Sequence, residues 1–109
     1  MTIKKRQNPQ RFAPVQGEVY ENAGGGKYLC IRSYGWERAN MINTVSGWEL
    51  FAHRIVRYDD GTIEWDCSDG LGFNDGRLAE YREIESRAKK AELRQRQASM
   101  LNAMLCCLI

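Results

Sequence analysis

The stretch WELFAHRIVRYDDGTIEWDCS, residues 48–68, decides the fold. Two runs rich in β-branched and aromatic residues, which favour strands, flank Asp59-Asp60-Gly61. An Asp-Gly step between two such runs is a strong signal for a tight β-hairpin. The sequence therefore predicts antiparallel strands at 48–58 and 62–67.

Alternation along the first of these strands predicts which side chains share a face. One face would carry Trp48, Leu50, Ala52, Val56 and Tyr58, with Arg54 as an exception, and the other Phe51, His53, Ile55 and Arg57. Both sets contain apolar or aromatic groups. We therefore expect both faces of this strand to be covered.

The chain before the hairpin has the same texture of short apolar runs separated by glycines. Further strands are predicted at 18–21, 27–33 and 39–45, with reversals at Gly24-Gly25-Gly26 and Ser46-Gly47. A flat sheet of five short strands would leave its edges exposed. We expect residues 15–74 to form a small bent antiparallel β-sheet or a partly open barrel.

Residues 75–109 have the pattern of a helix, which makes the predicted fold class α+β with one long C-terminal α-helix. Asn74 or Asp75 can cap its start, and no proline interrupts it. Three pairs of opposite charge stand four residues apart in the favourable order. They are Glu83 with Arg87, Glu85 with Lys89 and Glu92 with Arg96.

The end of this helix, ASMLNAMLCCLI at 98–109, is apolar nearly all round. A helix of that character is normally buried, and the charged stretch before it would carry it away from the sheet. The sequence therefore predicts a homo-oligomer that packs through Leu101, Met104, Leu105 and Leu108. The last four residues also fit a prenylation pattern, which matters only in a eukaryotic cytosol.

Residues 1–14, MTIKKRQNPQRFAP, are basic and contain two prolines. The pattern predicts a flexible arm, with Phe12 able to dock when a partner or ligand is present. The predicted organisation is thus an arm at 1–14, a β module at 15–74, and a helix with an oligomerisation tail at 75–109.

Composition narrows the function classes. The 109 residues carry a net charge of +2, distributed as +4 over 1–11, −4 over 12–74 and +2 over 75–109. This balance favours neither an acidic DNA mimic nor a dedicated duplex binder. The four cysteines form no CxxC pair and there is one histidine, so no metal site and no cofactor are expected. With no membrane-length apolar segment, we expect the protein in the cytoplasm.

The residues do not predict an enzyme. His53 has no serine or cysteine in a recognisable nucleophile motif nearby, and a lone histidine is more often structural. Glu64 and Asp66 fall on one strand face, but exposed alternating acids are common on hairpins. We expect no catalytic residue.

A binding site for a nucleotide is expected where the sheet meets the helix. In Gly72-Phe73-Asn74-Asp75-Gly76-Arg77, glycines open the backbone beside an aromatic, an amide and a guanidinium. The predicted roles are stacking for Phe73, a base or ribose contact for Asn74, and phosphate contacts for Arg77 and Arg57. Lys27 and Gly25 are the next candidates. The alternative is a simple helix cap with a surface arginine.

Two segments carry a family resemblance. VYENAGGGKYLC and NTVSGWELFAHRIVRYDDGTIEWDCSDGLGF, residues 19–30 and 43–73, resemble small phage and prophage anti-defence proteins. Within these the chain is similar to the first-described Thoeris anti-defence sponge family. The resemblance implies an oligomer in the host cytoplasm that sequesters a cyclic-nucleotide or cyclic ADP-ribose-type immune signal without cleaving it.

Two other classes remain open. One is a protein-directed inhibitor of a bacterial immune nuclease, similar to an anti-CRISPR, which would use the acidic 12–74 region. The other is a nucleic-acid-binding phage accessory protein that would use the basic arm and the helix, although the charge balance does not favour it. A sponge would copurify with a nucleotide, whereas a duplex binder would show a steep salt dependence.

Overall fold

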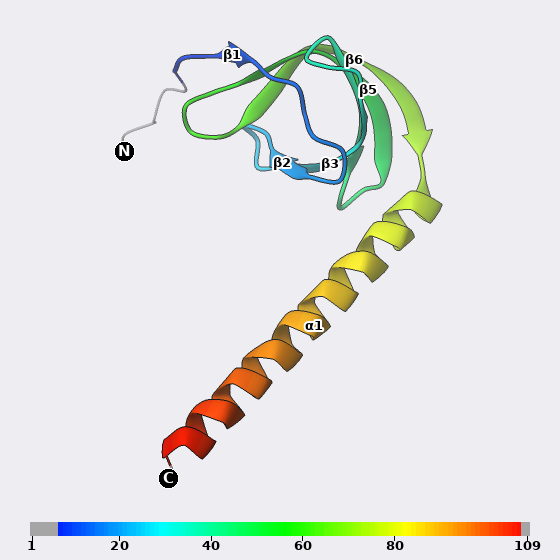
Figure 1. Cartoon of the computed structure of the whole chain (residues 1–109). Helices are drawn as coiled ribbons and strands as arrows, with labels where there is room; N and C mark the ends of the chain where they lie inside the picture. The colour runs from blue at the N-terminus through cyan, green and yellow to red at the C-terminus, as the bar shows by residue number, and fades with distance from the viewer. Residues whose placement is uncertain (1–6, 108–109) are drawn as a thin grey trace. The chain divides into compact units, whose positions relative to one another are not determined.

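The computed structural model describes residues 7–107, with side chains up to Met104 (Figure 1). It divides the chain into two compact units with the boundary between Leu78 and Ala79. The first unit holds the sheet and the first turn of the helix. The second unit is the rest of the helix.

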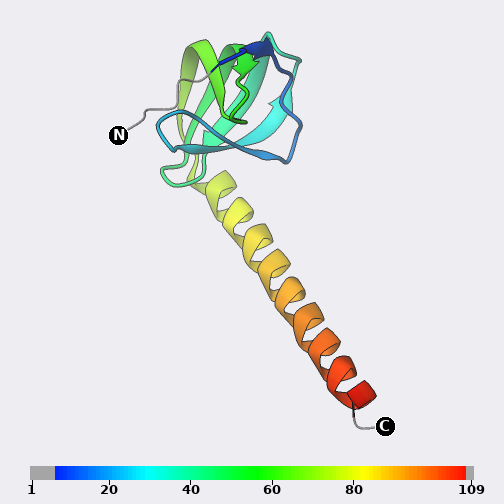
Figure 2. The same cartoon turned by 90° about the vertical axis from the view of Figure 1, so that its left-hand side faces the viewer.

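Six antiparallel strands form the sheet. They are β1 (Gln10–Arg11), β2 (Val19–Glu21), β3 (Lys27–Ser33), β4 (Arg38–Asn43), β5 (Trp48–Arg57) and β6 (Ile63–Phe73). Along one edge β5 pairs first with β4 and then with β1, and along its other edge it pairs with β6. The sheet curves strongly, as Figures 1 and 2 show, but is not closed. A single parallel bridge, between Asn22 and Ile63, links its two outer edges. The predicted fold class, a small bent antiparallel sheet followed by one long helix, is confirmed.

The strand boundaries differ from prediction mainly at β6. This strand runs on to Phe73, which pairs with Trp48, whereas the sequence predicts an end at 67. Gly70 and Gly72 break the apolar alternation in the added half, so the pattern of strand residues is lost there. Pairing with β5 nevertheless continues through a register shift opposite Glu49 and Leu50.

Part of the predicted flexible arm belongs to the sheet. Gln10 and Arg11 pair with Arg57 and Val56, and the amide of Phe12 donates to the carbonyl of Ile55 at 3.0 Å. The ring of Phe12 packs edge-on against Tyr20 and against the core. Burial of this ring and the short ladder hold residues 10–12 in place without a partner or ligand. Residues 1–6 of the arm lie outside the described residues.

The core lies on one side of the sheet, and one residue with a left-handed backbone decides which residues of β5 reach it. Arg54 has a positive φ of 52°, and the alternation of side chains between the two faces breaks at this residue. Ile55, with 0% exposure, therefore joins Leu50 and Ala52 in the core, and Val56 takes the other face. The predicted alternation is wrong beyond Arg54 for this reason. The other buried members of the core are Cys30, Ala39, Met41 and Ile63.

The helix α1 (Asp75–Cys107) begins where the sequence predicts. The side-chain oxygen of Asn74 accepts a hydrogen bond from the amide of Arg77 at 3.2 Å, which is an N-cap. All three predicted charge pairs form. In the described part of the chain, no helix is long and apolar enough to cross a lipid bilayer.

Candidate functional site

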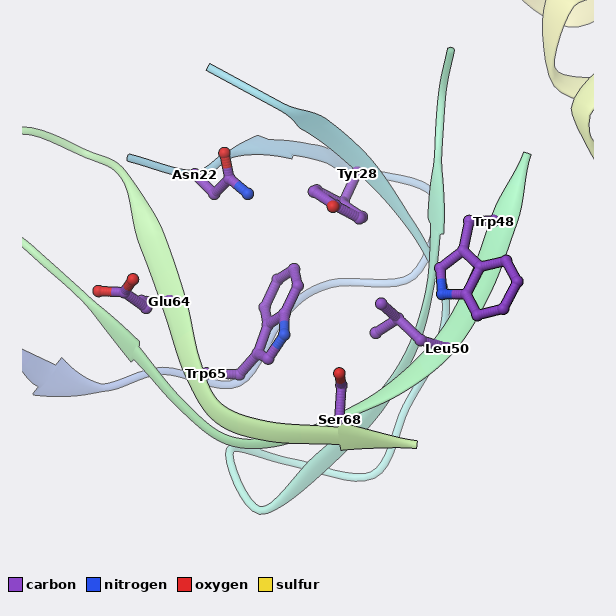
Figure 3. Close-up of a pocket in the computed structure, with 7 residues that line it drawn as sticks. All are labelled: Asn22, Tyr28, Trp48, Leu50, Glu64, Trp65 and Ser68. Carbon is purple, nitrogen blue, oxygen red and sulfur yellow. The ribbon is translucent and has the colours of Figure 1, made fainter. Parts of the chain in front are cut away.

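A pocket of about 370 Å³ opens on the core-facing side of the sheet, between the ends of β2 and β3 and the strands β5 and β6 (Figure 3). We call it the aromatic pocket. Its lining residues are Asn22, Tyr28, Trp48, Leu50, Glu64, Trp65 and Ser68. Its volume falls within the range of about 300–1,000 Å³ typical of small-molecule sites.

Two rings at the centre of the pocket are held by the core. Trp65 projects from β6 toward Tyr28 on β3, and their ring centroids lie 5.0 Å apart in an edge-to-face arrangement (Figure 3). Both rings pack against the buried cluster. Their orientation is therefore set before any ligand arrives.

The third ring, Trp48, lies over Gly70. A Cβ atom at position 70 would come within 2.6 Å of Cζ2 of Trp48, so only glycine admits the indole in this position. Phe73 packs edge-on against the same indole, with centroids 5.0 Å apart. Gly70, which interrupts the strand pattern in the sequence, thus leaves room for the indole of Trp48 at the side of the pocket.

Polar groups complete the lining. The side-chain oxygen of Asn22 accepts a hydrogen bond from the amide of Gly26 at 2.8 Å, which orients the Asn22 amide group. Ser68 contributes a hydroxyl, whereas the carboxylate of Glu64 is directed away from the rings of Tyr28 and Trp65 (Figure 3). The pocket therefore combines aromatic faces with hydrogen-bond donors and acceptors. Among its lining residues there is one acid and no lysine or arginine.

The structure brings three predicted ligand residues together, but around a carboxylate. Asn74 donates through Nδ2 to Oε1 of Glu49 at 3.0 Å, and Nε of Arg77 lies 3.2 Å from the same oxygen. Glu49 is only 8% exposed. Phe73 is 68% exposed and contacts Trp48. This geometry corresponds to the alternative interpretation, a helix cap with an arginine, because Glu49 already satisfies the groups meant for a phosphate.

Arg57 does not lie with these three residues. It stands at the opposite end of β5, nine residues and about 30 Å of extended strand from Trp48 and its partner Phe73. Its guanidinium stacks on Phe12 at 4.9 Å and donates to the carbonyl of Gly61 at 3.3 Å. The predicted site is therefore not one cluster.

Lys27 and Gly25 adjoin the aromatic pocket without lining it. Lys27 is the exposed first residue of β3, next to Tyr28. Gly25 has a φ of 82° in the turn that joins β2 to β3, and its amide donates to the carbonyl of Asn22 at 3.0 Å. The glycine run thus shapes the turn that presents Asn22.

A second pocket, of about 490 Å³, lies beside the first. It is lined by Arg11, Trp36, Arg54, Val56, Tyr58, Glu64, Trp65 and Asp66. The guanidinium of Arg11 stacks on Trp36 at 4.2 Å, and Nε of Arg54 lies 2.7 Å from Oδ2 of Asp66. The hydrogen bond to Asp66 is the largest cause of a raised pKa at Arg54. Arg54 is therefore held by a carboxylate.

His53 has a structural partner that the sequence did not reveal. Its Nε2 lies 2.7 Å from Oδ2 of Asp69, and Cys67 stands directly opposite it on β6. Nη2 of Arg54 donates to Sγ of Cys67 at 3.3 Å. The described residues contain no group of three or more His, Cys, Asp or Glu side chains able to hold a metal ion.

Sequence reasoning missed most of the aromatic pocket. It gave no role in a site to Asn22, Tyr28 or Ser68. The available signal was the glycine run beside Asn22 and Tyr28 together with Gly70 opposite Leu50.

No family model, curated protein or solved structure matches this chain. The fold and the site define a small antiparallel β module with an aromatic pocket on its core-facing side.

Proposed function

We propose that the protein is a binding protein that sequesters a cyclic-nucleotide or cyclic ADP-ribose-type immune signal without cleaving it. The observation that carries this proposal is the aromatic pocket, where the rings of Tyr28 and Trp65 meet and which Trp48, Asn22 and Ser68 also line. The base of the signal would enter this pocket. The phage anti-defence role comes from the family resemblance and agrees with such a site.

The pocket suits a nucleobase. Stacking on an aromatic side chain contributes about 1–3 kcal/mol per base. Asn22 and Ser68 supply donors and acceptors of the kind that a base edge or a ribose requires. Sequestration needs only tight binding, and a nanomolar complex corresponds to about −12 kcal/mol.

The partner in assembly would be a second copy of the chain. Of the predicted oligomerisation residues, Leu101 and Met104 are 58% and 63% exposed. The side chain of Leu105 and all of Leu108 lie outside the described residues. Burying these exposed groups between helices would remove apolar surface from water, and each fully buried side chain of this size contributes about 1.5–3 kcal/mol.

The first test is calorimetry on the full chain with cyclic ADP-ribose and a cyclic dinucleotide. Trp48→Leu should weaken binding of the accepted ligand about 5- to 100-fold, because one stacking surface is lost. Trp48 is half-exposed, so this change spares the core. Trp36→Leu, outside the aromatic pocket, is the matched control and should bind like the parent protein.

Ligand released by heat from the purified protein should have the same mass as the ligand that was added. If neither ligand binds, or if Trp48→Leu and the parent protein bind equally well, the aromatic pocket is not the site. A shortened or hydrolysed ligand would instead indicate an enzyme.

One observation favours the protein-directed inhibitor as a second candidate. The far edge of β6 has no neighbouring strand among the described residues, apart from the bridge at Ile63. Residues 66–71 of this strand are exposed and include Asp66, Asp69 and Leu71. Such an edge can accept an added strand from another protein. Inhibition of a purified immune nuclease that is lost in Leu71→Pro, with nucleotide binding kept, would support this role.

A further inference from the structure

The orientation of one side chain in the aromatic pocket indicates which kind of base the pocket accepts. We infer, on the basis of the proposed function, that Asn22 determines specificity. Its Nδ2 donates to an oxygen of the base, so the pocket selects a base with a keto group over a base with an amino group. Of the signals considered above, a cyclic dinucleotide with guanine bases then fits better than cyclic ADP-ribose, whose base is adenine.

The first argument is that the protein fixes which way the side-chain amide of Asn22 points. Its Oδ1 accepts a hydrogen bond from the backbone amide of Gly26 at 2.8 Å. Turning the side-chain amide over would place its nitrogen against the backbone N–H of Gly26, so that two donors would face each other. The nitrogen Nδ2 therefore points into the pocket, as Figure 3 shows.

The second argument is that this nitrogen has no acceptor within the protein. In the described part of the chain, the hydrogen bond from Gly26 is the only one made by the Asn22 side chain. The nitrogen carries two N–H donors. A base that fills the pocket removes water from them, and a buried donor without an acceptor weakens binding. The base must therefore supply the acceptor.

The other polar groups of the pocket favour the same choice. The ring nitrogens of Trp48 and Trp65 are donors only, and both are turned toward the middle of the pocket (Figure 3). The hydroxyls of Ser68 and Tyr28 can donate or accept, so they do not discriminate. The carboxylate of Glu64 is directed away from the rings of Tyr28 and Trp65. The groups that face the base are therefore richer in donors than in acceptors.

The common bases differ at the group concerned. Guanine and uracil carry a keto oxygen, which is an acceptor, where adenine and cytosine carry an amino group, which is a donor. An amino group turned toward Asn22 would bring donors against donors. Inosine and adenosine have nearly the same shape and differ in this exchange, as do uridine and cytidine. These two pairs of nucleosides therefore isolate the predicted hydrogen bond.

The test titrates the isotope-labelled full chain with each of the four nucleosides and follows the indole N–H signals of the tryptophans by NMR. The signals of Trp48 and Trp65 should shift, whereas the signal of Trp36, which lies outside the aromatic pocket, should not. Inosine should bind about tenfold more tightly than adenosine, and uridine more tightly than cytidine, because the amino base leaves a buried donor without an acceptor.

Asn22→Asp replaces Nδ2 by an oxygen and keeps the oxygen that accepts from Gly26. This variant should bind adenosine more tightly than inosine, because its carboxylate accepts from the amino group. Asn43→Asp is the matched control. Oδ1 of Asn43 likewise accepts from backbone amides, those of Val45 and Ser46 at 2.9 Å, but Asn43 does not line the pocket. The control should keep the preference of the parent protein for inosine.

The inference is overturned if adenosine binds as tightly as inosine, or if Asn22→Asp keeps the preference for inosine. It also fails, while the proposed function stands, if cyclic ADP-ribose or a cyclic dinucleotide shifts the Trp48 and Trp65 signals but none of the four nucleosides does. If none of these compounds shifts the two signals, the proposed function fails as well. Should Asn22→Asp not fold, which the Trp36 signal would report, the two nucleoside pairs decide with the parent protein alone.

Discussion

Individual residues of this chain take their roles from one or two contacts. Gly70 matters because its missing side chain leaves the space that Trp48 occupies. Asn74 both caps the helix and donates to Glu49. Its side-chain amide, predicted to contact a ligand, is therefore engaged by groups of the protein itself. The surroundings of Cys30 and Cys67 differ in the same way: Cys30 is buried in the core, and Cys67 is exposed.

The two cysteines should differ in reactivity. Burial raises the pKa of the Cys30 thiol to about 11, so almost none of it is thiolate at pH 8. Brief treatment of the folded protein with iodoacetamide at pH 8 should label Cys67 and leave Cys30 unlabelled, as read by peptide mass spectrometry. Labelling in denaturant is the control and should modify both. Equal labelling of the two in the folded state would contradict the described burial.

The same thiol predicts how stability changes with pH. Cys30 is an acid whose pKa is raised on folding, so the unfolded chain loses this proton near pH 9 and the folded chain only near pH 11. Between these values the unfolded state binds fewer protons, and the free energy of unfolding falls as pH rises. Urea unfolding from pH 8 to 11 should show a shallower fall in Cys30→Ala than in the parent protein. Parallel curves would show that Cys30 makes no contribution.

At the scale of elements, β5 determines the shape of the sheet. It is the only strand that pairs with three others in the described part of the chain, and Arg54, with its left-handed backbone, falls between its pairing with β4 and its pairing with β1. The amides of Arg54 and Ile55 donate to the carbonyls of Glu37 and Trp36, outside the β4 strand. The change of backbone conformation at Arg54 therefore lies where β5 passes from one partner to the next along the same edge.

Arg54 holds a left-handed backbone conformation that is unfavourable for residues with a side chain. Comparing Arg54→Gly with Arg54→Ala separates this strain from the loss of the Asp66 ion pair, because both variants lose the pair. Arg54→Gly should be the more stable variant by about 1 kcal/mol in urea unfolding. If Arg54→Ala proves equally stable, the positive φ is not maintained in solution.

At the scale of the whole molecule, the two units differ in how they are stabilised. The sheet unit has a buried cluster, whereas nearly every described side chain of the helix beyond Leu78 is exposed. Charge pairs at i, i+4 contribute only about 0.2–0.5 kcal/mol each, so they cannot replace a core. This difference is the physical reason to expect that the end of α1 packs against another copy.

Leu101→Glu combined with Met104→Glu should reduce the assembled mass measured by light scattering, because two carboxylates would have to be buried. Gln95→Glu with Ser99→Glu is the matched control, since it adds the same charge at exposed positions of the same helix. The control should keep the parent mass. If the variant with Leu101→Glu and Met104→Glu keeps the parent mass, this segment does not drive assembly.

Local features of the sequence determined the hairpin, the start of the helix and its three charge pairs. Each depends on residues a few positions apart: Asp60-Gly61 at the turn, Asn74 at the cap, and charged side chains one helical turn apart. These signals depend only on residues close together in the sequence, so the sequence alone was enough to predict the α+β fold.

Only the tertiary structure decided the rest. The docking of Phe12, the extension of β6 to Phe73 and the change of face after Arg54 all depend on pairing between segments distant in sequence. The aromatic pocket has the same origin, since Asn22 meets β6 only because the sheet curves until its edges touch at Ile63. Curvature results from strand twist and from the positions of bulges summed over the whole sheet, and no local pattern records that sum.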